Sequence, residues 1–309
     1  MLDGFLVVDK PSGVTSHHVV AVLRRVFRQK KIGHTGTLDP FATGVLPIAL
    51  GEGTKAITFL DESLKEYRAT MRLGITTDTQ DLEGVLLQER DWRQVTPEMV
   101  TELVPEFSGE LFQVPPMFSA LKRDGVPLYK LARKGETVER AARRVLIHGL
   151  AIDRIDLPEV SFTVRCSRGT YVRTLAHDMG ERLGCGAHLL QLRRTVSGPF
   201  TLGNAFTLDE LSAASPEEIA ARHFVPIRNA LSHLPVLELT DSGHARIRNG
   251  IAPAGDDLAN PDALPVAGPV LLCFRGGIAA VGEVLPRDQR ADGRLLRISR
   301  GFNQVSPLH

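Results

Sequence analysis

The sequence predicts an α+β protein: a mixed, largely antiparallel sheet flanked by helices, followed by a small β-rich module. Segments with strand and helix patterns alternate irregularly, so a doubly wound parallel sheet is not expected. After Leu211 the chain becomes rich in alanine, and Pro226 and Pro235 then lead into short strand-like runs separated by Gly, Pro and Asp. We therefore predict two domains, 1–230 and 231–309.

Hydrophobic periodicity assigns the elements. Thr15 or Ser16 can cap a helix that places Val19 and Leu23 on one face. Another helix has Leu175, Met179 and Leu183 spaced by four, which leaves Arg173 off the apolar stripe, and Gly184 is expected to end it. The predicted strands cover 5–8, 66–73, 160–166, 269–274 and 278–284, and the predicted helices cover 16–27, 97–104 and 171–183.

Composition excludes several classes of protein. The 309 residues are 43% apolar and 24% charged, which excludes a disordered or fibrous chain. The three cysteines form no Cys-x-x-Cys pair, and the histidines show no ligand spacing, so neither a disulfide framework nor a metal site is predicted. The longest stretch free of charged residues and histidine, 195–208, is too short for a transmembrane helix, and the N-terminus lacks a secretory pattern. We expect a cytoplasmic protein.

Charge is distributed unevenly along the chain. The total is +1, but residues 122–144 carry eight Lys or Arg against three acidic residues, and we call this segment the basic arm. Further basic clusters lie at 24–31 and 165–194. The three clusters either form one face for a polyanion or are separate solvated surfaces, and charge counts alone leave both interpretations open.

One motif suggests a nucleotide cofactor. Residues 51–56, GEGTKA, match the G-x-G-x-x-A pattern of dinucleotide sites. Pro47 is expected to interrupt the preceding strand, and Glu52 would place a carboxylate where a pyrophosphate should bind. Dinucleotide binding is therefore a weak alternative. No G-x-S-x-G motif supports a hydrolase.

A loop at 33–44, GHTGTLDPFATG, combines three glycines with one carboxylate. Glycine lets the backbone approach a ligand closely, and Pro40 favours an extended conformation for Asp39. The loop is therefore either a site with a fixed carboxylate or an ordinary turn started by Asp39 and Pro40.

Together with other ordered motifs, this loop resembles the TruB family of tRNA pseudouridine-55 synthases. The resemblance covers roughly residues 4–211 and implies the pseudouridine synthase fold. The matching segments are KPSGVTS at 10–16, GHTGTLDPFATG at 33–44, KEY at 65–67, TDTQD at 77–81, PPMFSALK at 115–122, GVPLY at 125–129, CSRGTYVR at 166–173 and LRRT at 192–195.

The resemblance implies a reaction and its catalytic residues. A uridine in the T-loop of tRNA, uridine 55, is isomerised to pseudouridine without a cofactor. Asp39 is implied to be the essential carboxylate, Arg173 its ionic partner, and Tyr67 the residue that stacks on the base and assists removal of the C5 proton. From the residues alone, Arg173 could equally be a surface helix arginine and Tyr67 a core tyrosine.

The same resemblance implies how the RNA is bound. His34 aids extrusion of the base, Asp81 contacts the rearranged loop, Leu192 packs against the pocket, and Lys10 is counted among the binding residues. The basic arm, within an insertion at about 112–145, grips the RNA and includes two further binding residues. They are Lys130 and Arg133.

The C-terminal module and the partners are predicted on the same basis. ARIRNG at 245–250 and GEV at 282–284 resemble parts of a PUA-type RNA-binding domain that would touch the acceptor end of tRNA. The expected partner is the T-arm of tRNA, with no membrane, no required protein partner and a monomeric state. The alternative is a noncatalytic protein that remodels tRNA, and a tRNA-folding role could also accompany catalysis.

Overall fold

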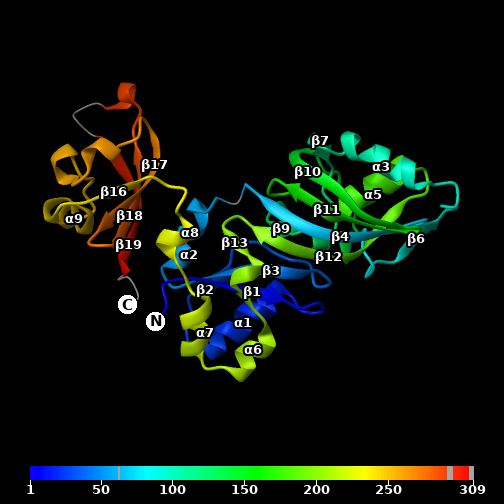
Figure 1. Cartoon of the computed structure of the whole chain (residues 1–309), viewed down its shortest axis with the longest axis horizontal. Helices are drawn as coiled ribbons and strands as arrows, with labels where there is room; N and C mark the ends of the chain where they lie inside the picture. Colours follow the sequence, from blue (N-terminus) through cyan, green and yellow to red (C-terminus); the bar gives the residue numbers. More distant parts are fainter. Residues whose placement is uncertain (62, 291–294, 306–309) are drawn as a thin grey trace.

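The computed structural model describes residues 1–61, 63–290 and 295–305, which fold around two main sheets and two small two-stranded ones (Figure 1). The larger sheet has the order β14-β1-β3-β12-β4-β11-β10-β7, with β2 on β3, β13 on β12 and β15 on β1. Two of its pairs are parallel, β1 with β14 and β3 with β12, and the others are antiparallel. This arrangement confirms the predicted mixed, largely antiparallel sheet.

The strands of this part of the chain are β1 Gly4–Lys10, β2 Ile32–His34, β3 Thr43–Leu50, β4 Lys65–Leu73, β5 Ile75–Thr77, β6 Leu86–Glu89, β7 Gly109–Gln113, β8 Lys122–Arg123, β9 Val126–Pro127, β10 Arg143–Asp156, β11 Glu159–Cys166, β12 Ala187–Ser197, β13 Phe200–Thr201, β14 Ala205–Phe206 and β15 Val225–Pro226. The helices are α1 Ser16–Val26, α2 Gly53–Ala56, α3 Pro97–Glu106, α4 Leu128–Ala132, α5 Val172–Arg182, α6 Leu208–Ala213, α7 Pro216–His223 and α8 Ile227–Ala230.

The helix ends follow from local chemistry. Thr15 caps α1 because its side chain accepts a hydrogen bond from the His18 amide, and Thr96 caps α3 in the same way through Met99. The chain leaves α5 at Gly184, whose φ of +83° favours glycine. The helices predicted over 16–27, 97–104 and 171–183 are confirmed, with ends shifted by one or two residues.

The prediction that Pro47 interrupts a strand is wrong. Pro47 lies within β3, opposite Val7 of β1. Its carbonyl accepts a hydrogen bond from the Thr35 amide at 3.1 Å, so the side of Pro47 that lacks an N–H faces the end of β2 and not β1. The expected loop at 33–44 is also shorter, because β2 and β3 take its two ends and leave 35–42 as the connection.

The second sheet packs against the first through an apolar interface. Its order is β16-β17-β18-β19, from Val236–Glu238, Gly268–Phe274, Gly277–Val284 and Leu296–Val305, and α9 Asp241–Arg248 lies beside it. Phe5 and Val7 of β1 share a buried cluster with Leu271 and Val281 of this sheet. Figure 1 shows the small sheet at one end of the larger one, with α3 and α5 at the other end.

The main core lies between the large sheet and the helices, and it includes Val19 and Leu23 of α1 and Leu175 and Met179 of α5. The three cysteines are free and buried, which confirms the prediction of no disulfide framework. Among the described helices, none is both long and apolar enough to cross a membrane.

Candidate active site

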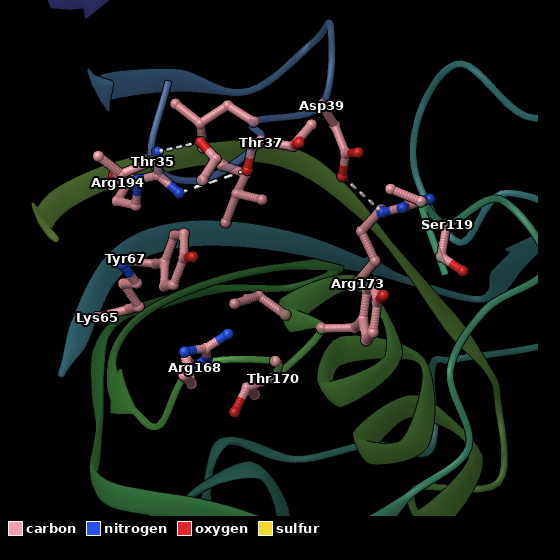
Figure 2. A pocket seen from close by; sticks show the side chains of 17 residues that line it. Thr35, Thr37, Asp39, Lys65, Tyr67, Ser119, Arg168, Thr170, Arg173 and Arg194 are labelled. Atoms are coloured by element: carbon pink, nitrogen blue, oxygen red, sulfur yellow. Dashed lines mark hydrogen bonds and ion pairs between the residues drawn. The ribbon is translucent and has the colours of Figure 1, made fainter. Parts of the chain in front are cut away.

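A pocket of about 280 Å³ opens where the 35–42 loop meets strands β4 and β12 and the start of α5 (Figure 2). Ligand sites span roughly 300–1,000 Å³, so this pocket suits one small group and not a large cofactor. The lining combines ionisable and aromatic side chains from segments far apart in the sequence: Asp39, Lys65, Tyr67, Arg168, Tyr171, Arg173, Leu192 and Arg194 among them.

Hydrogen bonds from Lys10 and Ser16 hold the backbone of the loop that carries Asp39. The Lys10 ammonium donates hydrogen bonds to the carbonyls of Pro11, Val14 and Pro40, at 2.8, 2.8 and 3.1 Å. Ser16, in the first turn of α1, donates to the Leu38 carbonyl and accepts from the Leu38 amide. These contacts fix the backbone on both sides of Asp39.

Lys10, expected to be a binding residue, holds the backbone around Asp39 in this structure. The residue is fully buried, and its three N–H groups are all used on backbone carbonyls. Burial lowers the pKa of Lys10 to about 8, an effect that the nearby Asp39 opposes. Position in a motif does not reveal which way a side chain points, and a binding role for Lys10 stays a prediction.

Arg173 connects Asp39 with a second carboxylate. Its Nε lies 2.9 Å from Asp39 Oδ2, and its Nη1 lies 3.2 Å from Asp81 Oδ2. Nη1 also donates to the Thr79 carbonyl and Nη2 to the Phe118 carbonyl. The Arg173 side chain is only 4% exposed, so the alternative of an ordinary surface helix arginine is wrong.

The acidity of Asp39 reflects competing influences. Its side chain is 36% exposed, and it lines the concave pocket. Burial raises the pKa of Asp39, Arg173 opposes that change, and the negative charge of Asp81 raises it further. Arg173 thus holds the carboxylate in a fixed direction while the neighbouring Asp81 shares the same cation.

Tyr67 forms the wall opposite this ion pair (Figure 2). It lies on β4, partly buried, where it packs against the main core and also lines the pocket, so it is both a core strand tyrosine and a pocket residue. Burial raises the pKa of the Tyr67 hydroxyl, and the adjacent Arg194 guanidinium counteracts this increase. Leu192 also lines the pocket and supplies an apolar surface, which agrees with the packing position expected from the sequence.

Two other predicted binding residues are placed differently. Asp81 is buried, and besides Arg173 it accepts hydrogen bonds from the Thr79 hydroxyl and the Glu83 amide, so its carboxylate is already engaged. His34 lies on β2 outside the pocket lining, with its ring edge-on to His17 at 5.2 Å. Burial, followed by His17, lowers the pKa of His34, which favours a neutral ring.

The basic arm projects between β7 and β10. It contains the β8–β9 hairpin and α4, and Ser119 and Ala120 reach the pocket lining from the segment just before it. Lys130, Arg133 and Lys134 are exposed. The arm therefore presents exposed cations that a polyanion could meet.

The cluster at 165–194 is not simply a solvated surface. Arg173 and Arg194 are buried in the pocket wall, whereas Arg193, on the other face of β12, pairs with Asp9 at 2.6 Å. Arg194 is a functional candidate that the sequence did not single out. Arg193 and Arg194 are adjacent in the LRRT motif. Neighbouring residues of a strand point to opposite faces, but the sequence does not show which of the two arginines faces the interior.

The dinucleotide alternative finds no support in the geometry. Glu52 is buried at the start of the four-residue α2 and pairs with Lys31 and Lys55 at 2.9 and 2.6 Å. A Cβ on Gly53 would lie 2.1 Å from the Gly4 carbonyl, so this glycine serves close packing. A carboxylate therefore occupies the place that a pyrophosphate would need.

The arrangement suits chemistry on one small planar group. Asp39 offers a fixed carboxylate, Arg173 balances its charge, and Tyr67 and Leu192 provide surfaces on which a base could stack. A carboxylate in such a position can act as a nucleophile or accept a proton near an oxocarbenium-like centre.

Comparison with protein families gives two adjoining matches. Residues 24–172 match the TruB family pseudouridylate synthase N-terminal domain, and residues 173–232 match the tRNA pseudouridylate synthase B C-terminal domain. The second sheet begins at Val236, beyond both matched ranges.

Similar proteins cover nearly the whole chain. The tRNA pseudouridine synthase B of Geobacter sulfurreducens is 55% identical over 304 residues, which cover 98% of this chain and 100% of that protein. The protein of the same name from Geotalea uraniireducens is 54% identical over 305 residues and covers 98% of each chain.

Solved structures of similar fold also cover nearly the whole chain. A chain in an H/ACA RNP bound to a substrate RNA containing 2'-deoxyuridine has a TM-score of 0.71 and 26% identity, covering 97% of this chain and 85% of that one. A chain in a Cbf5-Nop10-Gar1 complex also has a TM-score of 0.71, with 28% identity, covering 97% of this chain and 84% of that one.

Proposed function

The chain belongs to the TruB family of pseudouridine synthases, and from that premise we propose that it isomerises uridine 55 in the T-loop of tRNA. It is a tRNA pseudouridine synthase, an isomerase, by its similarity to tRNA pseudouridine synthase B. The observation that carries the proposal is the Asp39–Arg173 pair at 2.9 Å in a pocket walled by Tyr67.

The reaction rearranges bonds without a co-reactant. The bond between N1 of uracil and C1' of ribose breaks, the freed base turns, and C5 bonds to C1'. C5 then loses its proton, and N1 carries one. Asp39 acts on the sugar or the base as a nucleophile or proton acceptor, and Arg173 keeps it ionised and aimed. Tyr67 stacks on the base, and its hydroxyl assists removal of the C5 proton.

The uridine must leave its stack to reach Asp39. Unstacking costs a few kcal/mol, which contacts to phosphates and stacking in the pocket can offset. The basic arm supplies exposed cations, including Lys130 and Arg133, for the phosphate contacts. His34, whose ring lies edge-on to that of His17, aids extrusion of the base.

The proposal extends to the rest of the chain. Residues 1–230 form the catalytic domain, and 231–309 form a PUA-like domain that contacts the acceptor end of tRNA. In this second part, an exposed Arg275 lies 4.8 Å from the ring centroid of Phe274, a pairing suited to RNA contact. The single chain acts in the cytoplasm.

The test uses the purified chain with an unmodified tRNA transcript and no added cofactor. Pseudouridine, mapped at nucleotide resolution, is expected at position 55 alone. Asp39→Asn should abolish product while tRNA affinity stays within about threefold, because the change is isosteric and removes only the charge. Turnover by Asp39→Asn, or product at another position only, would refute the assignment.

We also propose a second role, in tRNA folding, because the basic arm and Asp39 would serve different steps. Cations that grip RNA do not depend on the catalytic carboxylate, so Asp39→Asn should still accelerate refolding of a misfolded tRNA. If this variant binds tRNA but does not accelerate refolding, the folding role is wrong. That outcome would leave the proposed catalytic function standing.

A further inference from the structure

Arg194 is a buried cation without a carboxylate partner. The residue is 2% exposed, and among the described residues no carboxylate oxygen lies within 4.0 Å of its guanidinium. Burying an unpaired charge is costly unless hydrogen bonds compensate it. The contacts that Arg194 makes in return therefore indicate what it does.

Those contacts reach the loop that carries Asp39. Nε donates to the Val45 carbonyl at 2.8 Å, Nη2 to the Gly36 carbonyl at 3.2 Å, and Nη1 to the Thr37 carbonyl at 3.4 Å. Figure 2 shows the guanidinium directly beneath this loop. One planar group thus ties the start of β3 to the turn that precedes Asp39.

Arg194 is also a neighbour of Tyr67. Arg194 and Tyr67 are directly opposed in the antiparallel pair of β12 and β4, where side chains on one face lie next to each other. The positive charge of the nearby Arg194 counteracts the increase that burial causes in the pKa of the Tyr67 phenol. Arg194 therefore contacts the Asp39 loop and is also the cross-strand neighbour of Tyr67, the second proposed catalytic residue.

We infer that Arg194 is a positioning residue that holds the Asp39 loop and the Tyr67 hydroxyl at a fixed separation across the pocket. This inference rests on the proposed function. The carbonyls of Gly36, Thr37 and Val45 are each met by a different nitrogen of the planar guanidinium, and the single nitrogen of a lysine cannot reproduce that spread. Charge alone is therefore not sufficient at this position.

The test compares Arg194→Lys and Arg194→Met with Arg193→Met, which removes the neighbouring arginine from the opposite face. Misplacement of reacting groups by about 1 Å can cost about 100-fold. We expect both Arg194 variants to lose about 100-fold in kcat with KM within threefold, and Arg193→Met to keep kcat. Folding is checked by circular dichroism and thermal unfolding.

A double-mutant cycle separates positioning from a purely structural role. In a Tyr67→Phe background, Arg194→Lys should lose at least tenfold less in kcat than it does with Tyr67 present, since part of its effect acts through that hydroxyl. Equal losses in both backgrounds, full activity of Arg194→Lys, or failure of both Arg194 variants to fold would overturn the inference. Absence of pseudouridine with the unaltered chain would instead refute the proposed function.

Discussion

Neutralising Lys130, Arg133 and Lys134 together should weaken the dependence of tRNA affinity on salt. All three side chains are exposed, and no carboxylate pairs with them within the described parts of the chain. The Arg133 guanidinium lies 5.5 Å from the centroid of the Tyr129 ring. These cations are therefore free to neutralise phosphates and release counterions.

The magnitude follows from three phosphate contacts. Each contributes about 0.7 to the slope of log affinity against log salt for single strands and about 0.9 for duplex, so the triple Gln variant should have a slope shallower by about 2 to 2.7. Between 50 and 200 mM salt, the unaltered chain should lose about 20- to 40-fold more affinity than the variant.

The assay is tRNA binding by filter retention or fluorescence anisotropy at several salt concentrations. The matched control removes the same charge by changing Arg93, Arg154 and Arg182 to Gln, three exposed arginines that already pair with carboxylates at 3.2, 2.8 and 2.7 Å. The control slope should stay close to that of the unaltered chain. An arm variant with an unchanged slope would show that these cations do not meet phosphates.

Two further predictions concern the pocket. Because isomerisation needs an ionised Asp39 whose pKa burial raises, kcat/KM should rise with pH through a value above that of an ordinary Asp, and Asp81→Asn should shift this limb to lower pH by removing a like charge. A shift to higher pH would contradict the assigned influence of Asp81. Gly44→Ala should destabilise the fold by about 3–5 kcal/mol in urea titrations, since φ is +101° and a Cβ would lie 2.1 Å from the Arg194 carbonyl. Gly13→Ala, with φ of +82° and open space, should cost only about 1 kcal/mol, and equal losses at both positions would refute the packing argument.

The sequence alone determined the features that depend on local chemistry. Hydrophobic spacing of three and four located α1 and α5, and alternation located β4 and β11, because these periods are properties of the helix and strand themselves. The resemblance indicated Asp39, Tyr67 and Arg173, and the pocket brings all three together.

Only the tertiary structure decided what each charged side chain does. Lys10, expected to bind, anchors three carbonyls, while Arg193 and Arg194, adjacent in sequence, separate into a surface ion pair and a buried contact with the Asp39 loop. Alternation along a strand fixes that neighbours face opposite ways, but it does not fix which face is covered. The burial, ion pairs and pKa of a side chain depend on which distant segments pack around it. In this protein those segments are β3, β4, β12 and α5.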